Sequence, residues 1–194
     1  LWSHCGGKLI WDDDLDTFLP DVTRPPIDEN GEDFILASGS AAGSFWPSKI
    51  SQDVMSKVKI ILKKFQIGKQ KTNKISIEEI SYGDGASIYL TPEGASEKLK
   101  SKSFVDFQND VKLSDLRLAM QEGYESVEHL KRYTTLGMAT DQGKTSNLNG
   151  LQLVSNLENK IVPEVGHTTF RPPYTPITIG AIVGREVGKH YRPT

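Results

Sequence analysis

The sequence has only one cysteine, Cys5, and four histidines among its 194 residues. A single thiol forms no internal disulfide, and with so few histidines it builds no convincing metal cluster, which favours a reduced, cytoplasmic setting. An excess of charge of one sign is also lacking, because 23 basic and 25 acidic residues leave a formal net charge of -2. We therefore expect neither nucleic acid nor a membrane surface as a partner.

Long apolar runs are absent as well. None approaches the roughly 18 residues of a membrane span, and no charged-then-apolar leader is present. The hydrophobic content of 37% supports folded structure but leaves little for one large core. The chain begins at Leu1 rather than at methionine, and both ends lie within patterned sequence. We therefore expect a fragment of a larger protein.

The N-terminal residues combine a short strand with an acidic turn. Residues 8–11 have strand character, and the acidic residues 12–14 follow directly. Adjacent carboxylates point in different directions and no calcium-loop spacing follows, so a solvated turn is favoured over a metal site. The neighbours His4 and Cys5 are likewise interpreted as an ordinary imidazole and a buried thiol.

A first candidate ligand site lies at residues 34–65. Residues 34–37 predict a buried strand, residues 38–43 a turn of small residues, and the apolar spacing from Ile50 to Phe65 a helix. This order of elements brings backbone amides close to a dinucleotide, although the full three-glycine fingerprint is lacking. Close packing of the turn is the favoured alternative to nucleotide contact. The candidate residues are Gly39, Ser40, Ala41, Ala42 and Gly43.

Three short helices around a polar loop are predicted beyond a boundary at residues 66–103. Ser114 and Ser126 are expected to cap the first two, which end at Gly123 and Gly137, and Ser146 or Asn147 caps the third. The intervening loop contains the phosphate-loop-like residues 143–146. Its register is wrong for such a loop, because five residues rather than four separate the two glycines and a helix precedes it. His129 on the second helix is interpreted as a surface or capping residue.

The tail is predicted to be extended, because Pro172, Pro173 and Pro176 lie within five residues. Arg171 on this segment is a candidate clamp for a phosphate or carboxylate, and a structural salt bridge is an equally good interpretation. No residue of the chain is a convincing catalyst.

Three segments resemble the alpha subunit of heterotetrameric sarcosine oxidase: residues 104–111, 129–147 and 169–176. The resemblance is strong from 104 to 194 and looser from 1 to 50. It implies a mixed α/β chain in which residues 1–68 end a dinucleotide-binding α/β domain and 69–103 form a linker. Residues 104–160 would be a small helical module, and 161–194 an extended, proline-rich connector towards a folate-binding domain.

The resemblance also implies a lost metal centre. Related amine and amino-acid dehydrogenase subunits bind a two-iron two-sulfur cluster through a Cys-x-Cys pair and a later Cys-x4-Cys pair. That pattern falls here on Asp106, Gln108, Asp141 and Ser146. Because such clusters are held by cysteine thiolates, we expect the scaffold without iron.

For cofactors, the resemblance implies FMN between the alpha and beta subunits, NAD on alpha, and FAD and tetrahydrofolate elsewhere in a complex that includes gamma and delta subunits. Lys144, Thr145 and Ser146 offer a cation, hydroxyls and amides suited to a flavin phosphate. Ser40 and Phe45 are the expected NAD contacts. The implied reaction is oxidative demethylation of sarcosine to glycine, with one-carbon transfer to tetrahydrofolate. A non-catalytic assembly module, or a subunit of a related N-methyl amino acid dehydrogenase, is the alternative.

Overall fold

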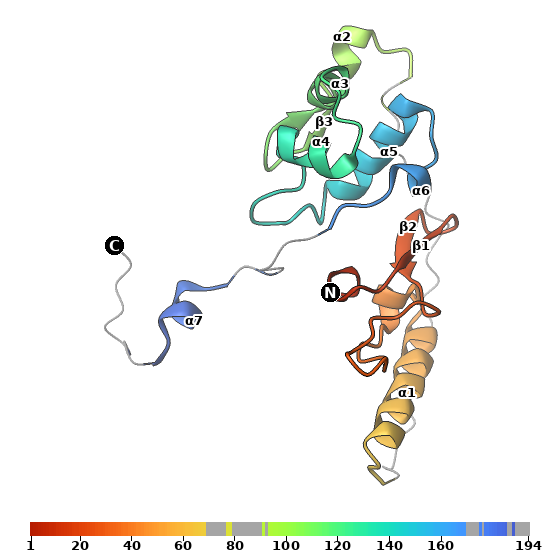
Figure 1. Cartoon of the computed structure of the whole chain (residues 1–194). Helices are drawn as coiled ribbons and strands as arrows, with labels where there is room; N and C mark the ends of the chain where they lie inside the picture. The colour runs from red at the N-terminus through yellow and green to blue at the C-terminus, as the bar shows by residue number, and fades with distance from the viewer. Residues whose placement is uncertain are drawn as a thin grey trace. The chain divides into compact units, whose positions relative to one another are not determined.

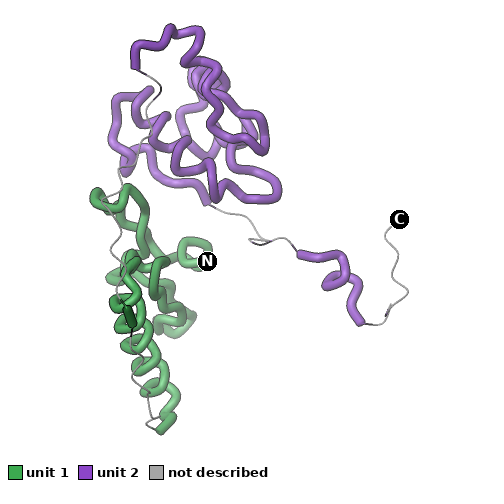
Figure 2. The backbone as a smooth tube through the Cα atoms, turned by 180° about the vertical axis from the view of Figure 1, so that it is seen from behind, with its two compact units in different colours: residues 1–88 green, residues 89–194 purple. Residues whose placement is uncertain are grey.

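The computed structural model describes residues 1–68, 77–78, 91, 93–169, 175, 177–185 and 188. The chain divides into two compact units, Leu1–Ile88 and Tyr89–Thr194, which are coloured separately in Figure 2. Each unit contains one short two-stranded sheet and several helices among its described residues (Figure 1). Among the described residues, no helix combines the length and the apolar character needed to cross a bilayer.

Unit 1 opens with a 3-10 turn, η1 (Ser3–Cys5), and an antiparallel hairpin of β1 (Leu9–Asp12) and β2 (Thr17–Pro20). Leu9 pairs with Pro20 and Asp12 with Thr17. The predicted strand at 8–11 is thus confirmed to within a residue. The acidic turn is also confirmed, because Asp12 Oδ1 accepts the N–H groups of Asp14 and Leu15 at 3.1 and 2.9 Å.

The strand predicted at residues 34–37 is wrong. This described stretch is irregular and leads into a 3-10 helix, η2 (Gly39–Ala42), and Phe34 is 55% exposed. The apolar run of residues 34–37 suggested a buried strand. The neighbouring sheet consists of β1 and β2 alone, so among the described residues this run has no strand to pair with.

The helix predicted after this turn is confirmed as α1 (Pro47–Lys64), which begins with a proline in its first turn, where no amide is required. Its apolar stripe remains partly open in the structure, and the side chains of Val58, Ile61 and Phe65 are 41%, 42% and 68% exposed.

Unit 2 contains the predicted set of three helices, α3 (Leu113–Gln121), α4 (Val127–Thr134) and α5 (Asn147–Glu158). α3 packs against α4, α5 and the short strand β4 (Val111–Lys112), which pairs with β3 (Phe104–Asp106) across a bulge. Figure 1 shows these helices gathered around β3. The buried core consists of Val105, Val111, Leu116, Ala119, Leu130, Leu136 and Val154.

The helix ends differ in detail from the prediction. The carboxylate of Asp115 accepts the N–H of Lys112 at 2.8 Å, so α3 begins one residue before Ser114 and is capped from within. Ser126 and Ser146 are the N-cap residues of α4 and α5, as predicted. α4 ends at Thr134, because its C-cap residue Thr135 has a φ of 64° and breaks the helix two residues before Gly137.

The flanks of unit 2 contain further short helices, α2 (Glu97–Lys100), α6 (Val162–Val165) and α7 (Ile179–Val183). The last two lie where an extended connector was expected, so the described parts of 161–194 are not extended throughout. Proline at the start of α6 is compatible with a first helical turn. Arg171 and the three prolines of the tail lie outside the described residues.

Candidate functional site

The carboxylate of Asp106, at the end of β3, is the centre of the polar network in unit 2. Asp106 is only 1% exposed. Its Oδ1 accepts the N–H groups of Gln108 and Asn109 at 2.9 and 3.1 Å. Its Oδ2 accepts the N–H of Gly137 at 2.8 Å, the Asn109 side-chain amide at 3.1 Å and the Ser146 hydroxyl at 3.2 Å. One buried side chain therefore joins the β3–β4 turn to both ends of the loop 136–146.

These contacts keep the carboxylate charged. Burial raises the pKa of Asp106, but the N–H of Gly137 and the donors of Asn109 and Gln108 outweigh that effect, so the pKa lies below the ordinary value of 3.8. Asp106 is therefore an anion at neutral pH, and its hydrogen bonds are charge-assisted.

The loop itself is ordered by a second carboxylate. Asp141 Oδ1 accepts the N–H of Gly143 at 2.8 Å, and its Oδ2 accepts the Thr145 hydroxyl at 2.7 Å. The N–H of Asp141 in turn donates to Gln108 Oε1 at 3.2 Å. Asp106 thus meets Ser146 while Gln108 meets Asp141, so the structure brings together the four positions on which the cysteine pattern was laid.

These four residues do not fit an iron–sulfur cluster. They supply carboxylate, amide and hydroxyl groups instead of thiolates, and both oxygens of Asp106 already accept hydrogen bonds. Across the described ranges, no group of three or more His, Cys, Asp and Glu side chains is placed to hold a metal ion.

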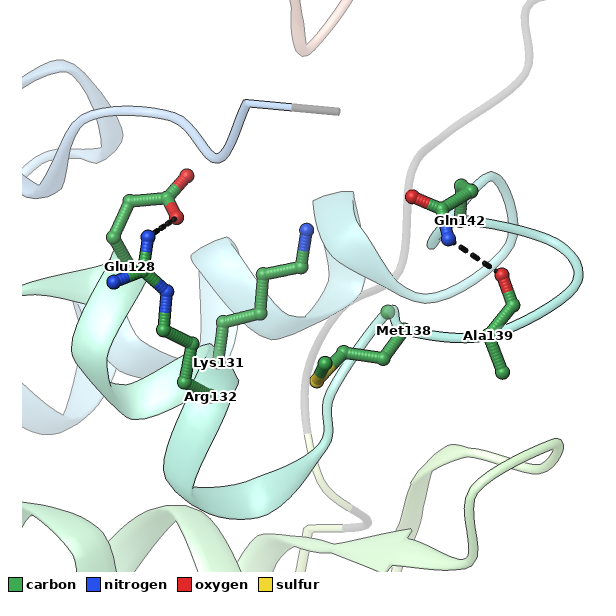
Figure 3. A pocket seen from close by; sticks show the side chains of 7 residues that line it. Glu128, Lys131, Arg132, Met138, Ala139 and Gln142 are labelled. Atoms are coloured by element: carbon green, nitrogen blue, oxygen red, sulfur yellow. Dashed lines mark hydrogen bonds and ion pairs between the residues drawn. The ribbon is translucent and has the colours of Figure 1, made fainter. Parts of the chain in front are cut away.

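A pocket of about 250 Å³ lies beside this loop (Figure 3). One wall is α4, which contributes Glu128, Lys131 and Arg132, and the other is the segment 137–142. Lys131 is buried, at 6% exposure, and Figure 3 shows its side chain extending from α4 into the pocket. Arg132 Nη2 lies 3.7 Å from Glu128 Oε2. The α4 wall of the pocket therefore carries two cations and one carboxylate, and it faces Gly137, Met138, Ala139 and Gln142.

The predicted phosphate residues lie on the far end of the same loop. Lys144 is exposed, and its Nζ donates to the Asp141 carbonyl at 3.2 Å. The Thr145 hydroxyl donates to Asp141 and the Ser146 hydroxyl to Asp106, and Ser146 is 1% exposed. In the structure, both hydroxyls therefore stabilise the loop itself.

The turn predicted to contact NAD is folded onto α1. The N–H of Gly39 donates to Asp53 Oδ2 at 2.9 Å, and the φ of Gly39 is +64°. Ser40 and Ala41 are exposed, Ala42 and Gly43 are half-buried, and Phe45 is 49% exposed. A carboxylate therefore lies against the first amide of the turn, where a pyrophosphate would be repelled.

Sequence reasoning missed Lys131 and the central role of Asp106. Lys131 lies in the segment 129–147 that carries the family resemblance, but nothing in helical spacing distinguishes a buried lysine from a solvated one. Asp106 had a local signal, because an aspartate that accepts the N–H groups two and three residues later is typical of a turn. Its contacts with Gly137 and Ser146 had no local signal.

The fold is shared with a solved dehydrogenase. L-proline dehydrogenase from P. horikoshii superposes with a TM-score of 0.61 at 23% sequence identity, covering 91% of this chain and 35% of that one. The chain therefore has a fold found in a dehydrogenase.

Sequence comparison defines the family. Residues 100–185 match the sarcosine oxidase A3 domain. Over its full length the chain is 36% identical to the sarcosine oxidase subunit alpha of Rhizobium meliloti (strain 1021), and over 97% of its length 32% identical to that of Corynebacterium sp. (strain P-1). The chain belongs to the sarcosine oxidase alpha-subunit family, which confirms the resemblance seen in the sequence. It spans 18% and 19% of the lengths of these two relatives.

Proposed function

We propose that this chain is the cofactor-holding and domain-joining part of a sarcosine oxidase alpha subunit, in a complex that oxidatively demethylates sarcosine to glycine and transfers the one-carbon unit to tetrahydrofolate. The names of the relatives support the activity and imply further subunits, which we propose to be beta, gamma and delta. FAD and tetrahydrofolate would bind elsewhere in the complex. This chain would contribute binding and orientation, since the hydroxyls of Thr145 and Ser146 donate to carboxylates that order the loop.

One observation carries the proposal for this chain. The loop 136–146, fixed on Asp106, forms one wall of the pocket, and the opposite wall places Lys131 and Arg132. A flavin phosphate carries negative charge and strong acceptor oxygens, which lysine, arginine and backbone N–H groups recognise. We propose that FMN binds across this loop and pocket, between this chain and the beta subunit.

Two groups of cationic side chains lie near the proposed phosphate position. Lys144 and Thr145 precede α5, where backbone amides at the start of a 12-residue helix favour an anion. Lys131 and Arg132 supply cationic groups from α4, and the nearby Glu128 carboxylate limits their net charge. When bound, FMN would accept electrons and pass them to oxygen, while these residues would hold and orient it.

The first experiment measures the flavin content of the purified native complex. Lys144→Ala is expected to lower flavin per complex, as is Arg132→Ala in the pocket wall. Lys98→Ala is the matched control, because Lys98 is an exposed lysine of α2 in the same unit. Unchanged flavin absorbance and unchanged turnover in both variants would contradict the proposal.

Binding of NAD by the small-residue turn 39–43 stays a separate prediction. Because the Asp53 carboxylate occupies the N–H of Gly39, we expect Asp53→Asn to strengthen any NAD binding by this turn. Equal NAD affinity in the Asp53→Asn and parent complexes, measured by titration calorimetry, would count against a site here.

Two measurements separate the proposed activity from the alternatives. Sarcosine-dependent release of peroxide together with flavin absorbance is expected for the oxidase. Absence of both would indicate an assembly module. Turnover with another N-methyl amino acid, but not with sarcosine, would indicate a related dehydrogenase.

A further inference from the structure

We propose that Asp106 is the positioning residue of the pocket, and that its carboxylate sets the conformation in which the loop 136–146 forms the pocket wall. The assignment concerns this chain's own residues. Only its consequence for flavin rests on the proposed function.

The contacts of Asp106 hold the loop at three points. Gly137 donates its N–H to Oδ2 at the start of the loop, and Ser146 donates its hydroxyl to the same oxygen at the end. The side-chain amide of Asn109 donates to Asp106 Oδ2 at 3.1 Å and also to the Met138 carbonyl at 3.3 Å. Gly137 and Met138 both line the pocket, so the carboxylate contacts the wall residues directly or through one side chain.

The backbone of the loop 136–146 would not favour this conformation without its anchoring contacts. Its backbone has positive φ at the non-glycine residues Ala139 and Gln142, at 60° and 53°, in a region that L-residues rarely occupy. Met138, Ala139 and Thr140 are exposed, so little apolar burial holds the tip of the loop. Polar anchoring at its two ends must therefore offset the backbone strain.

The charge of Asp106 matters more than its shape. Both carboxylate oxygens accept hydrogen bonds from N–H or O–H donors. An asparagine at this position has nearly the same size. Its NH2 group, however, would replace one acceptor oxygen and would face either the N–H of Gln108 or the N–H of Gly137, with which it cannot form a hydrogen bond. Asp106→Asn therefore removes the anchor and leaves the volume unchanged.

The test is hydrogen–deuterium exchange of the full chain, read by mass spectrometry over residues 135–147. Asp106→Asn is expected to raise exchange there by roughly tenfold or more, because a buried charged anchor is lost. Exchange over α3 should change far less. The matched control is Asp110→Asn, which removes the same charge from the same turn at an exposed position outside the network.

Two results would overturn the positioning role. One is loop exchange in Asp106→Asn equal to that in Asp110→Asn. The other is an equal rise across α3 and the loop, which indicates loss of the whole fold. If Asp106→Asn does not accumulate, Ser146→Ala removes one hydrogen bond of the network and Asn109→Ala removes two, and each is expected to raise loop exchange by about threefold or more. No rise in either variant would also overturn the assignment.

Flavin content separates this inference from the proposed function. A loosened loop with reduced flavin in the Asp106→Asn complex supports both. Normal flavin in the Asp106→Asn and Lys144→Ala complexes, with a loosened loop, overturns the flavin site and leaves the positioning role. Normal flavin in Asp106→Asn combined with flavin loss in Lys144→Ala overturns the claim that Asp106 prepares the loop for its ligand.

Discussion

The side chain of Asn147, the first residue of α5, occupies the space that a side chain at Gly137 would need. It also lies against Gly143, so both glycines of the loop pack on one asparagine. Their φ angles are +64° and +73°, a backbone conformation that glycine adopts readily. The two glycines that suggested a phosphate loop thus have a packing role.

Gly137→Ala is therefore expected to destabilise unit 2 by about 2–4 kcal/mol, because backbone strain and overpacking against Asn147 add. Urea unfolding followed by far-UV circular dichroism measures this loss. Gly123→Ala is the control, since Gly123 has a φ of +90° but open space around its α carbon, so only the backbone strain applies. Similar losses in the two variants would show that contact with Asn147 contributes little.

The core of unit 2 gives a second prediction. Leu116 is 0% exposed and packs in the buried cluster, so Leu116→Ala should cost roughly 2–5 kcal/mol of unfolding free energy through lost burial and the remaining cavity. Leu118→Ala, on the same helix at 46% exposure, should cost well under half as much. Tryptophan fluorescence provides an internal check, because Trp2, Trp11 and Trp46 all lie in unit 1. A shift in that fluorescence transition would mean that the substitution also disturbs unit 1.

A third prediction concerns pH and unit 1. The Thr23 hydroxyl and the Arg24 guanidinium donate to Asp21 at 2.6 and 2.7 Å, and together with the Thr23 N–H they lower the pKa of Asp21 from 3.8 to about 2. Because the folded-state pKa is depressed, the ionised form stabilises folding. Its contribution is complete above about pH 4 and is lost as the pH falls through the pKa of Asp21.

Asp21→Asn should therefore lower the Tm of unit 1 at neutral pH, and the difference from the parent should shrink between pH 4 and pH 2. Tryptophan fluorescence during thermal unfolding measures both effects. Asp14→Asn, in the exposed acidic turn, is the control. A Tm difference that stays constant across this pH range would contradict the assigned titration.

The fourth prediction concerns metal. Because the cysteine pattern of the related cluster-binding subunits falls here on Asp106, Gln108, Asp141 and Ser146, the purified native protein should contain no stoichiometric iron or acid-labile sulfide attributable to this module. Elemental analysis and a sulfide assay of the isolated chain measure this directly. Two irons and two sulfides per chain would show that the donor set has been misassigned.

Local sequence features predicted much of the secondary structure. Apolar spacing predicted α1, α4 and α5, and the serines at 126 and 146 marked the starts of the last two, because a helix period and an N-cap are properties of neighbouring residues. The error at 34–37 has the opposite origin. Whether an apolar run becomes a strand depends on a partner strand elsewhere, and none pairs with this described stretch.

The sequence by itself determined α1, α3, α4 and α5, the acidic turn at residues 12–14 and the family of this protein, since each depends on residue identity at fixed spacing. Only the tertiary structure decided that Asp106 meets Gly137 and Ser146, which lie 31 and 40 residues further along the chain. It also decided that Lys131 is buried beside the pocket. These contacts arise when β3, α4 and α5 pack around one core, and their geometry is set by that packing rather than by any local pattern.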